Sequence, residues 1–315
     1  MKKFLIKIGL FFLVLLVVDR ALGMAFSYMS DQAKGGYIGH HKYVTDKVNE
    51  DILIFGSSRA IHHYNPQIIT DSLGLSCYNC GQDGNGIILF YGLWKMIKEH
   101  HKPKMIIYDV STSFDLYEGE NNQRYLGWLR ADYDRPGIKP IFAAIDPTEE
   151  YKMMSWLYRH NSKFMQVLTD YVHPFFKIEG NGYLPLKGKM DRMKIKDTPK
   201  ERQKRVVDSQ KIYFINKLVD EMEGVKLVFV ASPSWYGSSD DAYQPIIEIC
   251  SRRNISFVDF SKDEKYIHKY QYFKDGTHLN DIGADEFTRD LIKELITFSK
   301  PRISYILAHS YTRQF

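Results

Sequence analysis

Three polar residues that lie far apart in the chain have the side-chain types needed for acyl transfer. Ser58 follows a short apolar run that ends in Gly56, and Asp275 stands three positions before His278. On a turn, that spacing lets the carboxylate reach Nδ1 of the imidazole while Nε2 faces a serine hydroxyl. We therefore predict a triad in which Ser58 is the nucleophile, His278 the base and Asp275 the residue that orients the imidazole.

A second short motif, Asn79-Cys80-Gly81, has the residue types to bind the reacting oxygen. Gly81 has no Cβ, so its backbone N–H can approach a substrate closely. Together with the N–H of Ser58, it is predicted to form an oxyanion hole, which stabilises the charge that develops on the carbonyl oxygen. Asn79 is expected to line the same site.

The residues beside Ser58 are also expected to line the site. Ser57 precedes the nucleophile and Arg59 follows it. Arg59 has two interpretations: it holds an anionic or acyl group near the nucleophile, or it forms a salt bridge with an acid from another part of the chain that covers the site. His62 and His63, one turn further on, either line the cleft or are ordinary, partly buried histidines.

Strand-like and helix-like segments alternate along the chain. Short apolar runs predict strands, and apolar residues at helical spacing predict helices between them. The predicted strands cover residues 51–56, 75–79, 104–110, 225–231 and 255–259, and the predicted helices 84–101, 204–222, 242–253 and 281–299; residues 60–74 are predicted as a loop and a helix. The pattern is typical of a three-layer α/β/α fold, with helices on both faces of a five-stranded parallel sheet.

The carboxyl ends of such strands are where ligands bind in open α/β sheets. Ser58 comes directly after the first predicted strand, and Asn79 ends the second. Asp109 and Ser111 belong to the end of the third strand, so we expect them to line the same cleft.

Residues 112–203 interrupt the alternation and contain many aromatic residues. No β-α-β unit is visible in this stretch, which predicts an insertion that forms a cap over the carboxyl ends of the strands. Its aromatic side chains have two interpretations. They stack on sugar rings, or they form the core of the cap itself.

The N-terminus has the pattern of an export signal. It begins with basic residues and continues as the apolar run Ile8–Val18, until Asp19 and Arg20 interrupt it. We predict that residues 1–26 form an uncleaved signal anchor, a single-pass membrane helix. The domain at 27–315 would then lie on the extracytoplasmic side, because the basic residues stay inside. A cleaved signal peptide and a buried core helix remain alternatives.

The composition is that of a globular protein. Of the 315 residues, 44% are hydrophobic and 26% are charged, which excludes a disordered tail protein, a collagen and a multi-span transporter. The net charge of +5 is too weak and diffuse to indicate a nucleic-acid partner. Cys77, Cys80 and Cys250 are too few for a disulfide scaffold and form no zinc set, so we interpret them as buried small residues and expect no metal or cofactor.

The three motifs resemble sequence blocks of the SGNH (GDSL-like) hydrolase and acyltransferase superfamily. Its nucleophile block is similar to Gly56–Ser58, its second block to Asn79–Gly81 and its last block to Asp275–His278. Its third block, Gly-x-Asn-Asp, supplies an asparagine to the oxyanion hole and has no counterpart in this chain. The run Gly-Ser-Ser-Arg is similar to the membrane-anchored branch, which resembles the proteins that acylate alginate and teichoic acid.

This resemblance implies a flavodoxin-like SGNH fold and an envelope-anchored serine acyltransferase or esterase. Its substrates would be O-acyl groups of a cell-surface polysaccharide, and its partners the membrane, a glycan or acyl donor, and a membrane acyl-transfer protein. The missing third block leaves an alternative, a catalytically inactive SGNH-fold protein that binds a glycan or assists assembly.

Overall fold

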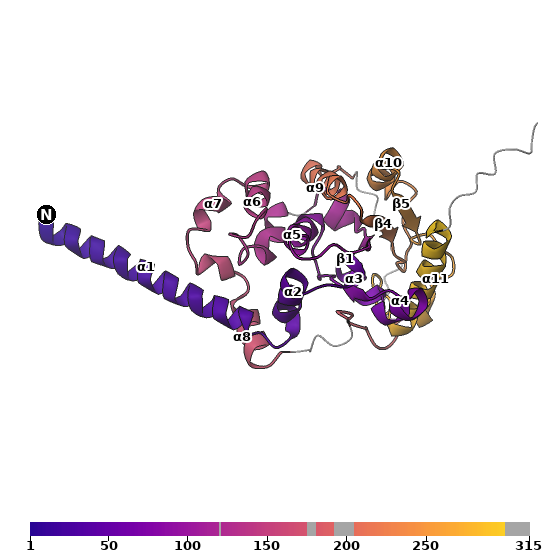
Figure 1. The fold of residues 1–315 in the computed structure, drawn as a ribbon, viewed down its shortest axis with the longest axis horizontal. Helices are drawn as coiled ribbons and strands as arrows, with labels where there is room; N and C mark the ends of the chain where they lie inside the picture. The colour runs from indigo at the N-terminus through magenta and orange to yellow at the C-terminus, as the bar shows by residue number, and fades with distance from the viewer. Residues whose placement is uncertain (120, 175–180, 192–204, 300–315) are drawn as a thin grey trace, which may run out of the picture.

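The apolar runs predicted as strands form one parallel sheet in the computed structural model, which describes residues 1–119, 121–174, 181–191 and 205–299 (Figure 1). The strands are β1 (Ile52–Gly56), β2 (Cys77–Asn79), β3 (Met105–Asp109), β4 (Lys226–Ala231) and β5 (Ser256–Asp259). Their order is β2-β1-β3-β4-β5, with every neighbouring pair parallel. The predicted α/β class with a five-stranded parallel sheet is therefore confirmed. In this strand order the topological switch point lies between β1 and β3, where doubly wound folds bind ligands.

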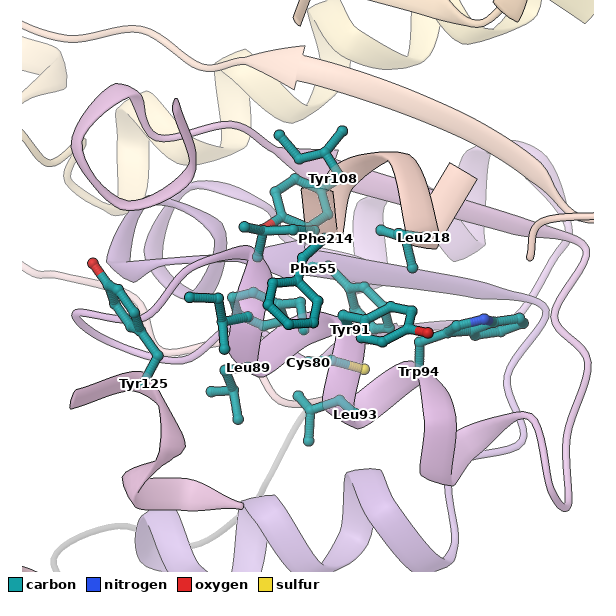
Figure 2. Close-up of a cluster of buried hydrophobic side chains, with 14 of the residues drawn as sticks. Phe55, Cys80, Leu89, Tyr91, Leu93, Trp94, Tyr108, Tyr125, Phe214 and Leu218 are labelled. Atoms are coloured by element: carbon teal, nitrogen blue, oxygen red, sulfur yellow. The ribbon is translucent and has the colours of Figure 1, made fainter. Parts of the chain in front are cut away.

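Helices cover both faces of the sheet because the strand side chains alternate between two apolar clusters. Leu53 and Phe55 of β1 belong to one cluster, and Ile52 and Ile54 belong to the other. The first cluster packs against α2 (Gly36–Asp46), α5 (Ile87–Ile97), α9 (Ser209–Asp220) and α10 (Gln244–Arg253); the second packs against α3 (Ser58–His63), α4 (Pro66–Leu73) and α11 (Asp281–Ser299). Figure 2 shows part of the first cluster, where Phe55 and Tyr108 of the sheet meet side chains of α5 and α9.

The segment predicted as a loop and a helix at 60–74 is formed by the end of α3 and by α4, with a break between these two short helices. Asn65 stands at the break, and its Oδ1 accepts the N–H of Gln67 at 3.1 Å. Pro66 occupies the first turn of α4, where its missing N–H costs nothing. Because of this break, α3 is a short helix that begins at Ser58 and ends at His63.

The predicted insertion after β3 is a series of short helices. These are η1 (Thr112–Leu116), η2 (Asn122–Trp128), α6 (Lys139–Ile145), α7 (Glu149–Lys152), η3 (Tyr158–His160) and α8 (Phe164–Val172). They pack on α5, α9, α2 and the long helix α1 (Lys2–Asp31). Tyr125 and Trp128 are buried and belong to the core of the insertion, whereas Tyr151 and Trp156 are exposed. Residues 120, 175–180 and 192–203 of the predicted insertion lie outside the described residues.

Helix α1 extends away from the rest of the molecule (Figure 1). The apolar side chains between Phe4 and Val18 are exposed. From Asp19 onward the helix is bound to the insertion: the Asp19 carboxylate accepts the N–H groups of Trp156 and Leu157 at 2.9 and 3.2 Å. A Cβ at Gly23 would lie 2.4 Å from the Cβ of Trp156, so this contact requires a glycine.

The predicted N-terminal membrane helix is not supported. Across the described ranges of the chain, no helix is both long enough and apolar enough to cross a bilayer. The physical reason lies at Asp19 and Arg20, which end the apolar run where the helix begins to pack on the domain. Residues 4–18 alone span about 22 Å as a helix, against a hydrocarbon core of about 30 Å.

Replacing Gly56 by alanine tests whether the turn after β1 is as tight as the structure shows. Gly56 has φ of +136°, and a Cβ there would lie 2.7 Å from the carbonyl oxygen of Asp109 and 2.9 Å from the Cβ of Ala60. We expect the free energy of unfolding, measured in urea, to fall by about 2–4 kcal/mol.

The matched control is Gly74→Ala. Gly74 also has a positive φ, +65°, but a Cβ there would meet nothing within 4 Å. It should cost only the left-handed strain of about 1 kcal/mol. Equal losses in the two variants would show that the contacts around Gly56 are not restrictive.

Candidate active site

Ser58 is presented by the turn between β1 and α3. The chain leaves the sheet at Gly56 and enters α3 at Ser58, so the Ser58 N–H belongs to the open N-terminus of a helix. Ser57 is the N-cap residue, is buried, and makes no side-chain capping bond. Of the two serines, Ser58 is the one whose hydroxyl meets the imidazole.

His278 comes from the loop before α11, 220 positions away in the sequence. Its Nε2 lies 2.8 Å from Ser58 Oγ, and its Nδ1 lies 2.9 Å from Asp275 Oδ2. Because the carboxylate can only accept, Nδ1 carries the proton and Nε2 is left to accept the serine hydroxyl. The structure thus brings together the three residues predicted as a triad, with the hydrogen bonds in the predicted directions.

The loop holds Asp275 ionised as well as oriented. Its Oδ1 accepts the backbone N–H groups of Thr277 and His278 at 2.8 and 2.9 Å. Partial burial raises the pKa of Asp275, but the hydrogen bonds from His278 and Thr277 outweigh it and lower the pKa to about 2. The carboxylate is therefore charged throughout the neutral pH range.

His63 fixes this loop to α3. Its Nε2 accepts the backbone N–H of Leu279 at 3.0 Å, and its Nδ1 lies 3.1 Å from Ser232 Oγ. Since an N–H only donates, Nε2 must carry a lone pair and His63 is neutral. Burial, with the charges of His278 and Arg59, lowers the pKa of His63 well below its usual value. His63 is a buried histidine, as one of the two interpretations held, and it positions the loop.

His62 has the opposite charge state. Its Nδ1 lies 2.6 Å from the carbonyl oxygen of Leu184, and its Nε2 lies within ion-pair distance of Asp83 Oδ1, at 3.3 Å. Both partners only accept, which favours the imidazolium form of the ring. Burial lowers the pKa of His62, but the bonds to Asp83 and Leu184 outweigh it and raise the pKa above its usual value.

Asp83 completes a second charged pair beside the base. The Tyr37 hydroxyl donates to its Oδ2 at 2.5 Å. Burial raises the pKa of Asp83, and the bonds from His62 and Tyr37 outweigh it and lower the pKa. The ring of His62 lies edge-on to that of His278, 5.6 Å between centroids. The sequence analysis did not identify Asp83 and Tyr37. The sequence does place His62 four residues after Ser58, on the same helical face, and so indicates that His62 and its partners lie near the nucleophile.

Arg59 and Asp109 are buried and pair with each other beneath the site. Arg59 Nη2 lies 3.3 Å from Asp109 Oδ1 and donates to the Val110 carbonyl at 2.5 Å. The Tyr64 hydroxyl donates to Asp109 Oδ2 at 2.6 Å. The salt-bridge interpretation of Arg59 thus agrees with the structure, but its acid comes from β3 and not from the insertion. Neither side chain is placed to line an open cleft, because Asp109 is fully buried and Arg59 nearly so.

Asn79 uses its whole side chain to hold the backbone around it. Its Nδ2 donates to the carbonyls of Ala60 and Tyr64 at 2.7 and 3.1 Å, and its Oδ1 accepts the N–H of Gly81 at 2.9 Å. The N–H predicted as an oxyanion donor is therefore already bonded within its own motif. A Cβ at Gly81 would lie 2.6 Å from the nitrogen of Ile61, so the glycine allows this motif to pack on α3.

Ser111 lies at the start of the insertion. Its backbone N–H donates to Asp115 Oδ2 at 2.6 Å, and its hydroxyl lies 3.3 Å from that of Ser113. The residue is buried, and no bond in these contacts joins it to Ser58 or His278. In the described part of the chain, no group of three or more His, Cys, Asp or Glu side chains is arranged to hold a metal ion.

Comparisons with known proteins give only a distant structural likeness. No family model and no curated protein matches the chain. One similar solved structure is described as a "putative platelet activating factor" from Streptococcus pneumonia. It is 12% identical, covers 88% of this chain and 98% of its own, and has a TM-score of 0.36. At that TM-score the likeness decides neither the fold nor the function of this chain.

The charge state of His62 can be tested through the pH dependence of stability. The folded pKa of His62 is raised, so its ion pair stabilises the protein fully below about pH 6.5 and progressively less as pH rises through the folded pKa. We expect His62→Gln to lower the free energy of unfolding by about 1–3 kcal/mol at pH 6, and by less at higher pH. Urea unfolding measured from pH 5.5 to 9 checks this.

His100→Gln serves as the control because His100 is an exposed histidine after α5. Its unfolding curve should follow that of the unmodified protein at every pH. A His62→Gln curve that runs parallel to the unmodified one would contradict the imidazolium assignment.

Proposed function

We propose that the protein is a serine esterase or O-acyltransferase that acts on O-acyl groups of a cell-surface polysaccharide. The observation that carries this proposal is the hydrogen bond of 2.8 Å between Ser58 Oγ and His278 Nε2, with Asp275 bonded to the opposite ring nitrogen. Nucleophile, base and orienting acid in this geometry are the parts that acyl transfer requires. The arrangement stands at the carboxyl end of β1, next to the switch point of the sheet.

In the proposed reaction, Ser58 Oγ attacks the acyl carbonyl carbon while His278 Nε2 takes the hydroxyl proton. Asp275 keeps the second ring proton on Nδ1 and stabilises the imidazolium that forms. The tetrahedral intermediate collapses to an acyl-enzyme, and the leaving alcohol takes the proton from His278. Water or a sugar hydroxyl then gives its proton to His278 and attacks the acyl carbon, and His278 returns the proton to Ser58 Oγ as the bond from Ser58 to the acyl group breaks.

The oxyanion of the proposed mechanism has few open hydrogen-bond donors to stabilise it. The Ser58 N–H stands at the N-terminus of α3, where helix dipole and open donors favour negative charge. The Gly81 N–H can contribute only if it exchanges its bond to Asn79 for one to the substrate. This is the specific observation that favours the second candidate, a catalytically inactive glycan-binding or assembly protein with the same fold.

The substrate class is supported by two features outside the triad. The basic start and apolar run of the N-terminus are typical of export, which favours an envelope glycan. Tyr236 is half exposed, and its ring edge lies 3.3 Å from the position of a Cβ at Gly276, inside the Asp275–His278 loop. An aromatic ring beside a triad is a suitable surface for packing a sugar ring.

Ser58→Ala tests the nucleophile, with Ser57→Ala as its matched control. Hydrolysis of p-nitrophenyl acetate should fall by at least about 10³-fold in the first variant, because no other group replaces the attacking oxygen. The second should keep most activity. A fluorophosphonate probe should label Ser58 alone, as read by mass spectrometry. Full activity of Ser58→Ala would contradict Ser58 as the nucleophile, whereas no hydrolysis by the unmodified protein and no labelling of Ser58 would favour the inactive candidate.

Asp275→Asn tests the orienting role and its pH dependence. Loss of the carboxylate lets the imidazole adopt the wrong tautomer, so kcat should fall by about 10³–10⁴-fold. Because the pKa of Asp275 is about 2, this carboxylate stays charged above about pH 4. The pH–rate profile of the unmodified protein should therefore show no inflection from this carboxylate between about pH 4 and 7. A pH–rate profile with an inflection from the carboxylate in that range would contradict the assignment.

A further inference from the structure

A cavity lies where α1, α2 and the insertion meet. Its volume is about 180 Å³, enough for about six water molecules. Its walls come from the last turns of α1, from α2, from residues 127–132 and from residues 159–167. None of the residues of the proposed triad lines it, so it is a separate site.

Three basic groups in the cavity wall already lie beside a carboxylate. Each lies within 2.8 Å of an acidic oxygen, so none of the three is free to act as the charge partner of a ligand. These pairs are His41–Asp132, Lys42–Asp31 and Arg159–Asp134. His160 also lines the cavity and lies 3.0 Å from the hydroxyl of Ser27, through Nε2.

Lys163 is the exception. Its Nζ lies 3.6 Å from the centre of the Trp128 ring, and among the described residues no carboxylate lies within ion-pair distance of it. Burial and the like charge of Arg130 lower the pKa of Lys163 to about 8. The group is thus still mainly a cation at neutral pH, and it contacts the Trp128 ring and not one of the carboxylates of the wall.

The backbone before Lys163 is in a conformation that costs energy. Ser162 has φ of +68°, in the left-handed region that non-glycine residues rarely adopt. Lys163 follows directly, and its N–H closes a turn on the carbonyl of His160 at 2.9 Å. The strained residue, Ser162, thus directly precedes Lys163 and helps to set the direction of its side chain.

We propose that this cavity binds a small organic anion, a carboxylate or phosphate on a short carbon body, with Lys163 as the charge partner. The ammonium group of Lys163 supplies the positive charge for the anion, since the other basic groups named above already lie beside carboxylates. Ile38, Val167 and the Trp128 ring supply apolar surface for the carbon part. Ser27 and Ser30 supply hydroxyl groups within the same wall. The volume limits the occupant to a small molecule or to the headgroup of a larger one.

Titration calorimetry on the full chain tests the proposal, with glycerol 3-phosphate and inorganic phosphate as probes. We expect saturable binding of glycerol 3-phosphate, weakened at least tenfold in Lys163→Met and retained within a few-fold in Lys163→Arg. Lys217→Met is the matched control, since Lys217 also stands over an aromatic ring, at 5.5 Å from Tyr213, but belongs to α9 and does not line the cavity. It should bind like the unmodified protein.

Further measurements distinguish a free anion from a lipid headgroup and define the results that would overturn the proposal. Vesicles of phosphatidylglycerol, compared with phosphatidylcholine, show whether a lipid headgroup is the occupant, through binding that depends on Lys163. Absence of saturable binding of both phosphates and of the anionic vesicles would overturn the proposal. So would binding that is equal in Lys163→Met, provided that urea unfolding shows this variant to be folded; if it is not folded, Lys163→Gln replaces it.

Discussion

The contact between Ser58 and His278 depends on a buried neutral histidine that joins α3 to the loop before α11. His63 receives the N–H of Leu279 and contacts the hydroxyl of Ser232, which follows β4. The hydroxyl of Thr288, in α11, accepts the N–H of Asn65 just after α3 at 3.0 Å and adds a second connection. Because Ser58 belongs to the same short helix as His63, these bonds decide the distance between hydroxyl and imidazole. A histidine serves here because one ring nitrogen accepts while the other donates.

Charged groups beneath the site hold the strand ends together. Arg59, at the start of α3, bonds to the carbonyls of Val110 and Ser232, which follow β3 and β4. Burial raises the pKa of its partner Asp109, and the charge of Arg59 opposes that rise. A buried pair of this kind is weak evidence for stability, but losing one member is costly, since the other is left unpaired. The residue next to the proposed nucleophile thus works on the backbone of the sheet and not on a ligand.

Two groups flank the proposed base. Asp275 is bonded to its Nδ1, while the ring of His62, whose pKa is raised, stands edge-on to its ring. Asp83 and Tyr37 hold His62 in place from the motif that follows β2 and from α2. The carbonyl of Leu184 does the same from the far end of the insertion. Segments that are distant in the sequence therefore contribute to the electrostatic surroundings of one imidazole.

Local pattern was sufficient for the sheet and for the contact between Asp275 and His278. A short apolar run such as Ile52–Gly56 must be buried on both sides, and alternation with helical segments leaves little choice but a parallel sheet. Asp275 and His278 are three residues apart, so a turn alone brings them into contact. The sequence could not show the state of Arg59 or of the Asn79 amide nitrogen, because their partners come from other elements.

Tertiary structure alone decided which polar groups were already satisfied. Sequence placed Arg59 and Asp109 at strand ends, but only packing showed them bonded to each other and buried. It also showed that α1 packs on the insertion from Asp19 onward, which shortens its free apolar part. The unpaired charge of Lys163 has no local signature for the same reason. Hydrophobic periodicity is a property of neighbouring residues, whereas the pairing of a charge depends on what folds against it.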